Sequence, residues 1–191
     1  MIRTAFAALL LGVSLTASAR ATTQRDLDSF ARGLGVRLTI LDNAPPKCPG
    51  GREGCFLSEI DLRVPQDLSA DLSRGKFALY FNSVAPVFAL ESDTFSVRHI
   101  NGDLHVIEPR AGAPVVPGSR HRMNLWSQGH FFSAFYPMPN MFLASEGLQA
   151  RTVEATRPVI DRESGLERLP FVAPMTDEAK LATAGAGDDT K

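Results

Sequence analysis

The segment HINGDLHVIEP, residues 99–109, gathers side chains that could do chemistry. It contains His99 and His105, with Asp103 and Glu108 close to them. Imidazole and carboxylate groups are ligands of zinc and also act as general acids and bases. The segment is therefore a candidate metal or catalytic site. Its function depends on how the chain folds around the Asn-Gly pair at its centre.

Asn101-Gly102 between alternating residues predicts a two-residue hairpin, because both central positions of a type I′ turn need a positive φ. The strand pairs expected across this turn are Ile100 with Asp103, His99 with Leu104, and Arg98 with His105. The two histidines then share a sheet face only diagonally, and no third ligand has a fixed position. Asp103 is expected to bond turn amides. We therefore predict a structural hairpin without a metal or cofactor.

Other catalytic patterns are absent from the sequence. Glycoside hydrolysis needs two carboxylates on opposite sides of the sugar, and the acids here are scattered. Ser145 and Ser164 lie outside any G-x-S-x-G context. The glycine-rich loop at 50–54 follows no strand–helix pattern, so it is not a phosphate-binding loop. No catalytic residue is predicted, and the chain by itself is not expected to be an enzyme.

Most of the chain alternates apolar and polar residues with a period of two, which is typical of antiparallel strands buried on one face. Many short strands with turn residues between them indicate an all-β sandwich or barrel. Residues 22–33 are compatible with a short helix or an extended lead-in. The strands are expected at 36–40, 56–64, 77–82, 86–91, 94–100, 104–108, 119–126, 130–135, 140–145 and 148–155.

The two ends of the chain differ from the middle. Residues 1–21 have a basic start, an apolar run and A-x-A spacing, so they predict a signal peptide and export to the periplasm or the medium. Residues 22–156 are expected to form the sandwich, and residues 157–191 an extended, linker-like tail that packs the apolar piece LPFVAP. No later apolar run is long enough to span a bilayer.

The charge of the chain excludes two classes of partner. Cleavage after Ala21 removes two of the 20 basic residues, Arg3 and Arg20, and none of the 21 acidic ones, so the net charge becomes -3. A nucleic-acid binder would show a basic face, and docking on an anionic membrane needs the same. Neither partner is expected.

Cys48 and Cys55 are the two cysteines of the chain, in CPGGREGC. In an oxidising compartment they are expected to form a disulfide, which closes a short loop and stabilises the fold by about 2–3 kcal/mol. The competing interpretation, a thiolate metal site, needs two further ligands at suitable spacing.

Aromatic residues crowd into the 17 positions from 126 to 142. Aromatic rings can stack on sugar faces, although they also dominate hydrophobic cores. Trp126 and Tyr136 are the foremost candidates for carbohydrate binding, with Phe132 and Phe135 beside them. Phe131 and Phe142 complete the cluster, which is the candidate ligand surface of this sequence.

Four segments carry a family resemblance: GKFALYFNSV, ESDTFSVRHINGDLHVIEP, VPGSRHRMNLW and YPMPNMFLAS. Together they resemble the N-terminal domain of bacterial chitobiases and related β-N-acetylhexosaminidases, over roughly residues 30–180. The resemblance implies an antiparallel β-sandwich akin to carbohydrate-binding domains. It implies chitin or chito-oligosaccharide as the ligand. Phe77 stands where the family tends to have a tryptophan.

In complete enzymes of that family a separate barrel carries the catalytic Asp–Glu pair, so no catalytic residue can be carried over to this chain. The first hypothesis is a secreted, non-catalytic chitin-binding module. The alternative is an N-terminal fragment of a β-N-acetylhexosaminidase, whose partner would be the catalytic glycosidase domain. A third hypothesis is a sandwich that accepts a strand from a protein partner at a sheet edge.

Overall fold

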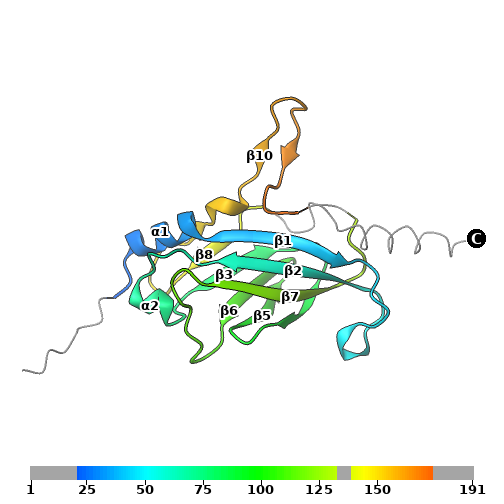
Figure 1. Cartoon of the computed structure of the whole chain (residues 1–191), viewed down its shortest axis with the longest axis horizontal. Coiled ribbons are helices and arrows are strands. Elements are labelled where there is room, and N and C mark those ends of the chain that lie inside the picture. Colours follow the sequence, from blue (N-terminus) through cyan, green and yellow to red (C-terminus); the bar gives the residue numbers. More distant parts are fainter. Residues whose placement is uncertain (1–20, 133–138, 174–191) are drawn as a thin grey trace, which may run out of the picture.

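A computed structural model of the chain describes residues 21–132 and 139–173 (Figure 1). Two α-helices, two 3-10 helices (η) and eleven strands are assigned in these residues. Their bounds are α1 Gln24–Gly33, β1 Gly35–Asp42, η1 Pro49–Gly51, β2 Cys55–Arg63, α2 Ala70–Ser73, β3 Ala78–Asn82, β4 Val87–Glu91, β5 Phe95–Asn101, β6 Leu104–Pro109, β7 Arg120–Gln128, β8 Phe142–Ala144, β9 Arg151–Thr152, η2 Glu154–Thr156, β10 Val159–Ile160 and β11 Glu167–Arg168.

Two antiparallel sheets face each other and form the sandwich that the alternation predicts. One sheet has the strand order β1-β2-β7-β4, and the other has the order β5-β6-β3-β8-β9. In Figure 1, β1, β2 and β7 form the front layer, with β3, β6 and β5 behind them. The prediction of an all-β antiparallel sandwich is confirmed.

The core lies between the inner faces of the two sheets. Strand β3 shows how the alternating sequence builds it: Leu79 and Phe81 are buried, whereas Ala78, Tyr80 and Asn82 are half-buried on the outer face. Complete burial of such an apolar side chain stabilises the fold by about 1.5–3 kcal/mol. The same alternation therefore sets which side chains the outer faces present.

Two predicted strands are wrong in part. His130–Phe132, the described part of the strand expected at 130–135, is irregular. Phe131 instead packs its ring edge-on against Phe56, with centroids 5.7 Å apart, and its carbonyl accepts a hydrogen bond from Asn43 Nδ2 at 3.0 Å. The strand expected at 148–155 is only the short β9, because η2 turns the chain at Glu154–Thr156.

Helix α1 resolves the alternatives for residues 22–33. Thr23 and Asp26 form a capping box, in which each side chain bonds the other residue's backbone N–H. Leu27 and Phe30 are buried beneath the helix. Of the two alternatives for residues 22–33, the short helix is therefore the one that forms, and it covers one end of the sandwich.

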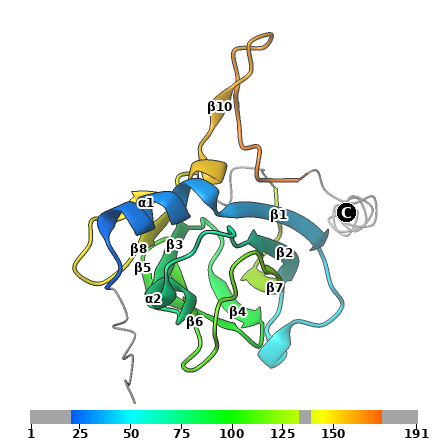
Figure 2. The same ribbon diagram turned by 60° about the vertical axis from the view of Figure 1, so that its left-hand side comes forward.

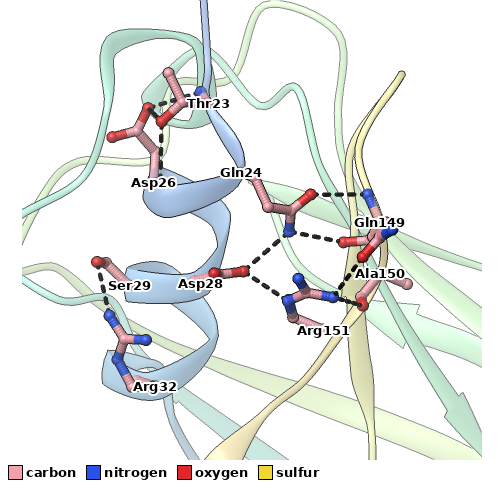
Figure 3. A network of polar contacts seen from close by, with 9 residues as sticks. All are labelled: Thr23, Gln24, Asp26, Asp28, Ser29, Arg32, Gln149, Ala150 and Arg151. Atoms are coloured by element: carbon pink, nitrogen blue, oxygen red, sulfur yellow. Dashed lines mark hydrogen bonds and ion pairs between the residues drawn. The ribbon is translucent and has the colours of Figure 1, made fainter.

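Polar contacts fasten α1 to the loop before β9 (Figure 3). Gln24 Nε2 donates to the carbonyl of Gln149 at 3.1 Å, and the N–H of Gln149 donates to Gln24 Oε1 at 2.9 Å. Arg151 Nε lies 2.6 Å from Asp28 Oδ1. The hydrogen bonds from Gln24 and Arg151 hold the pKa of Asp28 below its ordinary value. These contacts tie the helix to the segment 149–151.

After η2 the chain forms a hairpin, β10–β11, that projects from the sandwich in both views (Figures 1 and 2). The chain then returns to the body, where Leu169 and Phe171 are buried. Leu38 of β1 exchanges backbone hydrogen bonds of 2.7 Å with Phe171 and Ala173. The described part of the apolar piece LPFVAP, residues 169–173, therefore packs on the sandwich as predicted, whereas the hairpin before it was not expected.

The predicted disulfide is confirmed: Cys48 and Cys55 are bonded, with their Cα atoms 6.0 Å apart. It closes the loop that leads into β2. Among residues 21–132 and 139–173, no helix is long and apolar enough to cross a membrane.

Candidate functional site

The hairpin formed by β5 and β6 forms in a different register from the predicted one. His99 lies directly opposite His105, and Asn101 pairs with Leu104. Ile100 is a bulge, and Gly102, with φ 49°, occupies the turn with Asp103. The predicted pairs were wrong because the bulge adds one residue to β5, which moves the turn one position along the chain.

His105 is a structural link between the two sheets. Its Nε2 accepts a hydrogen bond from the N–H of Val87 in β4 at 3.2 Å, and its Nδ1 lies 2.9 Å from the carbonyl oxygen of Asp103. The ring stacks on Phe81. Burial lowers the pKa of His105, so the neutral imidazole donates from Nδ1 and accepts at Nε2.

His99 is exposed and its Nε2 lies 2.8 Å from the carbonyl of Gly102. The rings of His99 and His105 are 5.1 Å apart, yet no group of three or more His, Cys, Asp or Glu side chains among the described residues could hold a metal ion. Within this segment, His105 therefore links the two sheets and His99 contacts the turn.

The outer face of the β1-β2-β7-β4 sheet carries the predicted residue Trp126. On β7, Met123, Leu125 and Ser127 point into the core, so Asn124 and Trp126 point outward. We call the outward residues around this tryptophan the Trp126 face. In the strand register they form two rows, Leu57–Trp126–Ala89 and Glu59–Asn124–Glu91.

Glu91 fixes the orientation of the indole ring. The Nε1–H of Trp126 donates to Glu91 Oε1 at 2.8 Å, and Nδ2 of Asn124 donates to Glu91 Oε2 at 2.9 Å. Charged acceptors make the stronger class of hydrogen bond. The N–H of the half-buried indole therefore already has Glu91 as its hydrogen-bond partner. The ring itself offers a ligand apolar contact.

Further along β7 the same sheet face becomes basic. Asp61, whose side chain is 2% exposed, accepts hydrogen bonds from Arg120 Nε at 2.8 Å and Nη2 at 2.5 Å. These bonds from Arg120 hold the pKa of Asp61 below its ordinary value. Arg122 lies about 13 Å from Trp126 along the strand, at about 3.3 Å per residue. A hollow of about 400 Å³ is lined by Glu91, Arg120 and Arg122.

Among the other predicted sugar-binding residues, the structure describes Phe132. Phe132 is 72% exposed and its ring lies 6.0 Å from that of His130. Phe135 and Tyr136 lie outside the described residues. Phe131 belongs to the core, and Phe142 lies on the opposite sheet. The aromatic cluster of the sequence is thus divided between different parts of the molecule.

Sequence reasoning missed a second aromatic feature, on the outer face of the β5-β6-β3-β8-β9 sheet. Tyr80 of β3 and Phe142 of β8 stack in parallel, with centroids 4.9 Å apart and planes 3° apart. The alternation in β3 already placed Tyr80 outward. Its partner Phe142 could be found only from the pairing of β3 with β8.

Comparison with known proteins establishes the family. Residues 33–189 match the model of a family described as "Putative carbohydrate binding domain". The chain belongs to this family of carbohydrate-binding domains. It is a binding domain, and the sequence resemblance to the β-N-acetylhexosaminidase group is confirmed by its relatives.

Two of these relatives are β-hexosaminidases. The chain is 35% identical over 105 residues to β-hexosaminidase B of Pseudoalteromonas piscicida, which covers 55% of this chain and 13% of the relative. It is 28% identical over 144 residues to the β-hexosaminidase of Vibrio vulnificus, covering 71% of this chain and 16% of the relative. The chain therefore spans about one sixth or less of these relatives' length.

Solved structures show weaker similarity. A GH20 exo β-N-acetylglucosaminidase from Vibrio harveyi matches with a TM-score of 0.43 and 9% identity, over 75% of this chain and 18% of that one. A chitin-binding domain from Streptomyces coelicolor matches with a TM-score of 0.36 and 10% identity, over 60% of this chain and 95% of that one. Family membership rests on the family match.

Proposed function

We propose that this carbohydrate-binding domain binds chitin and soluble chito-oligosaccharides through the Trp126 face. The names of its relatives support an N-acetylhexosamine polymer as the ligand class, because both are β-hexosaminidases. The sequence resemblance to chitobiase N-terminal domains points the same way. The domain supplies retention on the polymer, and hydrolysis belongs to another domain.

One observation carries the proposal: the indole of Trp126 points outward and donates its Nε1–H to Glu91. A sugar ring has an apolar face of C–H groups and an edge of hydroxyls. The row Leu57–Trp126–Ala89 offers apolar contact for the ring face, and the row Glu59–Asn124–Glu91 offers polar groups for the hydroxyls. A ring fixed in advance loses little freedom when it binds.

Export to the periplasm or the medium is part of the proposal. The Cys48–Cys55 disulfide supports it, because such bonds persist in oxidising compartments. Sequencing the N-terminus of the protein recovered outside the cytoplasm should show a start at Thr22 or Arg20, the two positions that follow the A-x-A signals. Recovery of the uncleaved chain from the cytoplasm alone would contradict export.

A second candidate function is that of the binding part of a β-N-acetylhexosaminidase, with a catalytic glycosidase domain as its partner. The small share of the relatives' length that this chain spans favours it. Reading the DNA downstream of the coding region tests it. An in-frame or frameshifted catalytic barrel would support the fragment hypothesis, and unrelated genes would oppose it.

Co-sedimentation with insoluble chitin, with cellulose beside it, tests the proposed function. We expect saturable retention on chitin that soluble chito-oligosaccharide competes, and a loss of retention in Trp126→Ala. Val159→Ala is the matched control, because Val159 is 49% exposed on the projecting hairpin β10–β11. Equal retention of wild type and Trp126→Ala would refute the role of the Trp126 face.

A further inference from the structure

The outer face of the second sheet contains a hollow of about 620 Å³ that the family match does not assign. It lies at the end of the sandwich where α1 and α2 are found (Figure 1). Ala78 and Ala144 are paired across β3 and β8, and their small side chains leave the sheet surface low at this point. Larger residues surround them, among them Lys76, Phe77, Tyr80, Glu108, Ser145 and Glu146.

Tyr80 forms an aromatic wall of this hollow. Phe142 stacks in parallel on Tyr80 but does not line the hollow, so it supports the tyrosine ring from outside. Both rings are half-buried. An aromatic ring fixed by stacking offers a rigid apolar surface with a hydroxyl at its tip.

The polar rim of the hollow is held in place by contacts within the protein. Lys76 Nζ lies 3.0 Å from Asp71 Oδ1, and the Ser145 hydroxyl donates to the carbonyl of Lys76 at 2.8 Å. Glu108 is paired with Arg98 at 3.3 Å. The rim therefore presents donors and acceptors in fixed positions, as a ligand with many hydroxyls requires.

Most of the charged residues that line the hollow are acidic. One lysine stands against three acidic residues that line the hollow, Asp71, Glu108 and Glu146. A phosphate or carboxylate ligand would meet like charge, whereas an uncharged sugar would meet hydrogen-bonding partners. An aromatic wall beside a mixed polar rim therefore fits a neutral sugar.

We propose that this hollow is a second sugar site, separate from the Trp126 face, that takes a short soluble chito-oligosaccharide. The ligand class rests on the proposed function. Tyr80 offers such a ligand an aromatic face, and Lys76 and Glu108 offer hydrogen-bonding groups beside it. The Trp126 face, on an open sheet, is suited to the polymer.

The test is a titration of the purified protein with N,N′-diacetylchitobiose, followed by ¹H–¹⁵N NMR. We expect amide shifts at residues 78–80 and 144–146, separate from the shift of the Trp126 indole N–H. Tyr80→Leu should weaken the affinity measured from the amides of residues 78–80 and 144–146 at least tenfold. The affinity measured from the indole N–H should stay within twofold of the wild-type value. Ala144→Leu fills the hollow with a larger side chain but keeps the Tyr80 ring. It should change the two affinities in the same way.

Tyr80→Phe is the conservative variant, because it retains the ring, and circular dichroism checks the fold of each protein. If Tyr80→Leu is unfolded, Ala144→Leu decides the question. Absence of shifts at the hollow in the wild type, or shifts unchanged in the folded variants, overturns this site. Failure of the proposed function is a different result: no indole response and no retention on chitin.

Discussion

The two outer faces of the sandwich use aromatic residues in different ways. On the first sheet a single indole lies on an open surface, and its polar edge is held by Glu91. On the second sheet Tyr80 is supported by Phe142 and forms the wall of a hollow. Alternation in the strands places both Trp126 and Tyr80 outward. We propose that each of these two surfaces contacts a sugar.

The largest effect that separates the two faces should come from the disulfide. The loop closed by Cys48 and Cys55 leads into β2, and the carbonyl of its Gly54 accepts a hydrogen bond from Gly129, just after β7. The double variant Cys48→Ser/Cys55→Ser should lower the free energy of unfolding by about 2–3 kcal/mol. Denaturant unfolding measures this.

In that double variant chitin retention should weaken more than binding at the hollow, since the loop adjoins the first sheet. Unfolding of reduced wild-type protein provides the control for the serine substitutions. An unchanged free energy of unfolding would show that the loop is held by its other contacts.

The next effect concerns the basic end of the first face. Arg120→Ala should lower the free energy of unfolding by about 1–3 kcal/mol, because the buried carboxylate of Asp61 loses its two hydrogen bonds. Arg98→Ala, which removes an exposed ion pair with Glu108, should cost less than about 1 kcal/mol. Equal costs in thermal unfolding would contradict the distinction between the two ion pairs.

A smaller effect is expected at Glu91, which positions the indole. Glu91→Ala should weaken chitin binding by about 0.5–1.5 kcal/mol, roughly twofold to twelvefold, because the Trp126 ring gains freedom. Glu91→Gln keeps an amide oxygen that can accept from Nε1, so it should retain most of the affinity. Binding at the Tyr80 hollow should remain unchanged in both variants. Weaker sugar binding at the hollow in Glu91→Ala would show that the two faces are coupled.

The smallest effect is a pH dependence that the two sheets share through His105. Burial lowers the folded-state pKa of His105, so the unfolded state takes up a proton first as the pH falls below about 6.5. The free energy of unfolding should therefore decrease from pH 7 to pH 5, and the decrease should be smaller in His105→Gln. Burial also lowers the pKa of His121. Part of the pH dependence of the free energy of unfolding should therefore remain in His105→Gln. Thermal unfolding at several pH values tests this.

Asp71, at the rim of the hollow, should stay ionised in that range. Hydrogen bonds from Lys76 and Arg74 lower the pKa of Asp71 to about 2, from 3.8. Its contribution to stability is present above pH 4 and is lost as the pH falls from about 4 to 2. Binding of diacetylchitobiose at the hollow should therefore be the same at pH 7 and pH 5. A loss at pH 5 would contradict the role of the Asp71–Lys76 pair.

Local patterns in the sequence predicted much of the fold. Strict alternation in 77–82 located β3 and oriented Tyr80 outward, and two cysteines in one short loop predicted their pairing. The register at 99–109 could not be predicted, because nothing in the local pattern marks Ile100 as a bulge.

The sites depend on pairing between distant strands. Glu91 meets Trp126 only because β4 pairs with β7, and Phe142 meets Tyr80 only because β3 pairs with β8. Neither pairing follows from the periodicity of one strand. The crowding of aromatic residues from 126 to 142 could not show that Phe131 enters the core or that Phe142 lies on the opposite sheet.

The central claim is that Trp126 contacts the sugar, and the chain itself provides the probe, because Trp126 is its single tryptophan. The measurement is the tryptophan fluorescence of the purified protein during titration with soluble chitohexaose. We predict a saturable change in emission that Tyr80→Leu retains, with a midpoint that matches competition for insoluble chitin. Unchanged emission from a protein that still sediments with chitin would place the sugar elsewhere and contradict the account.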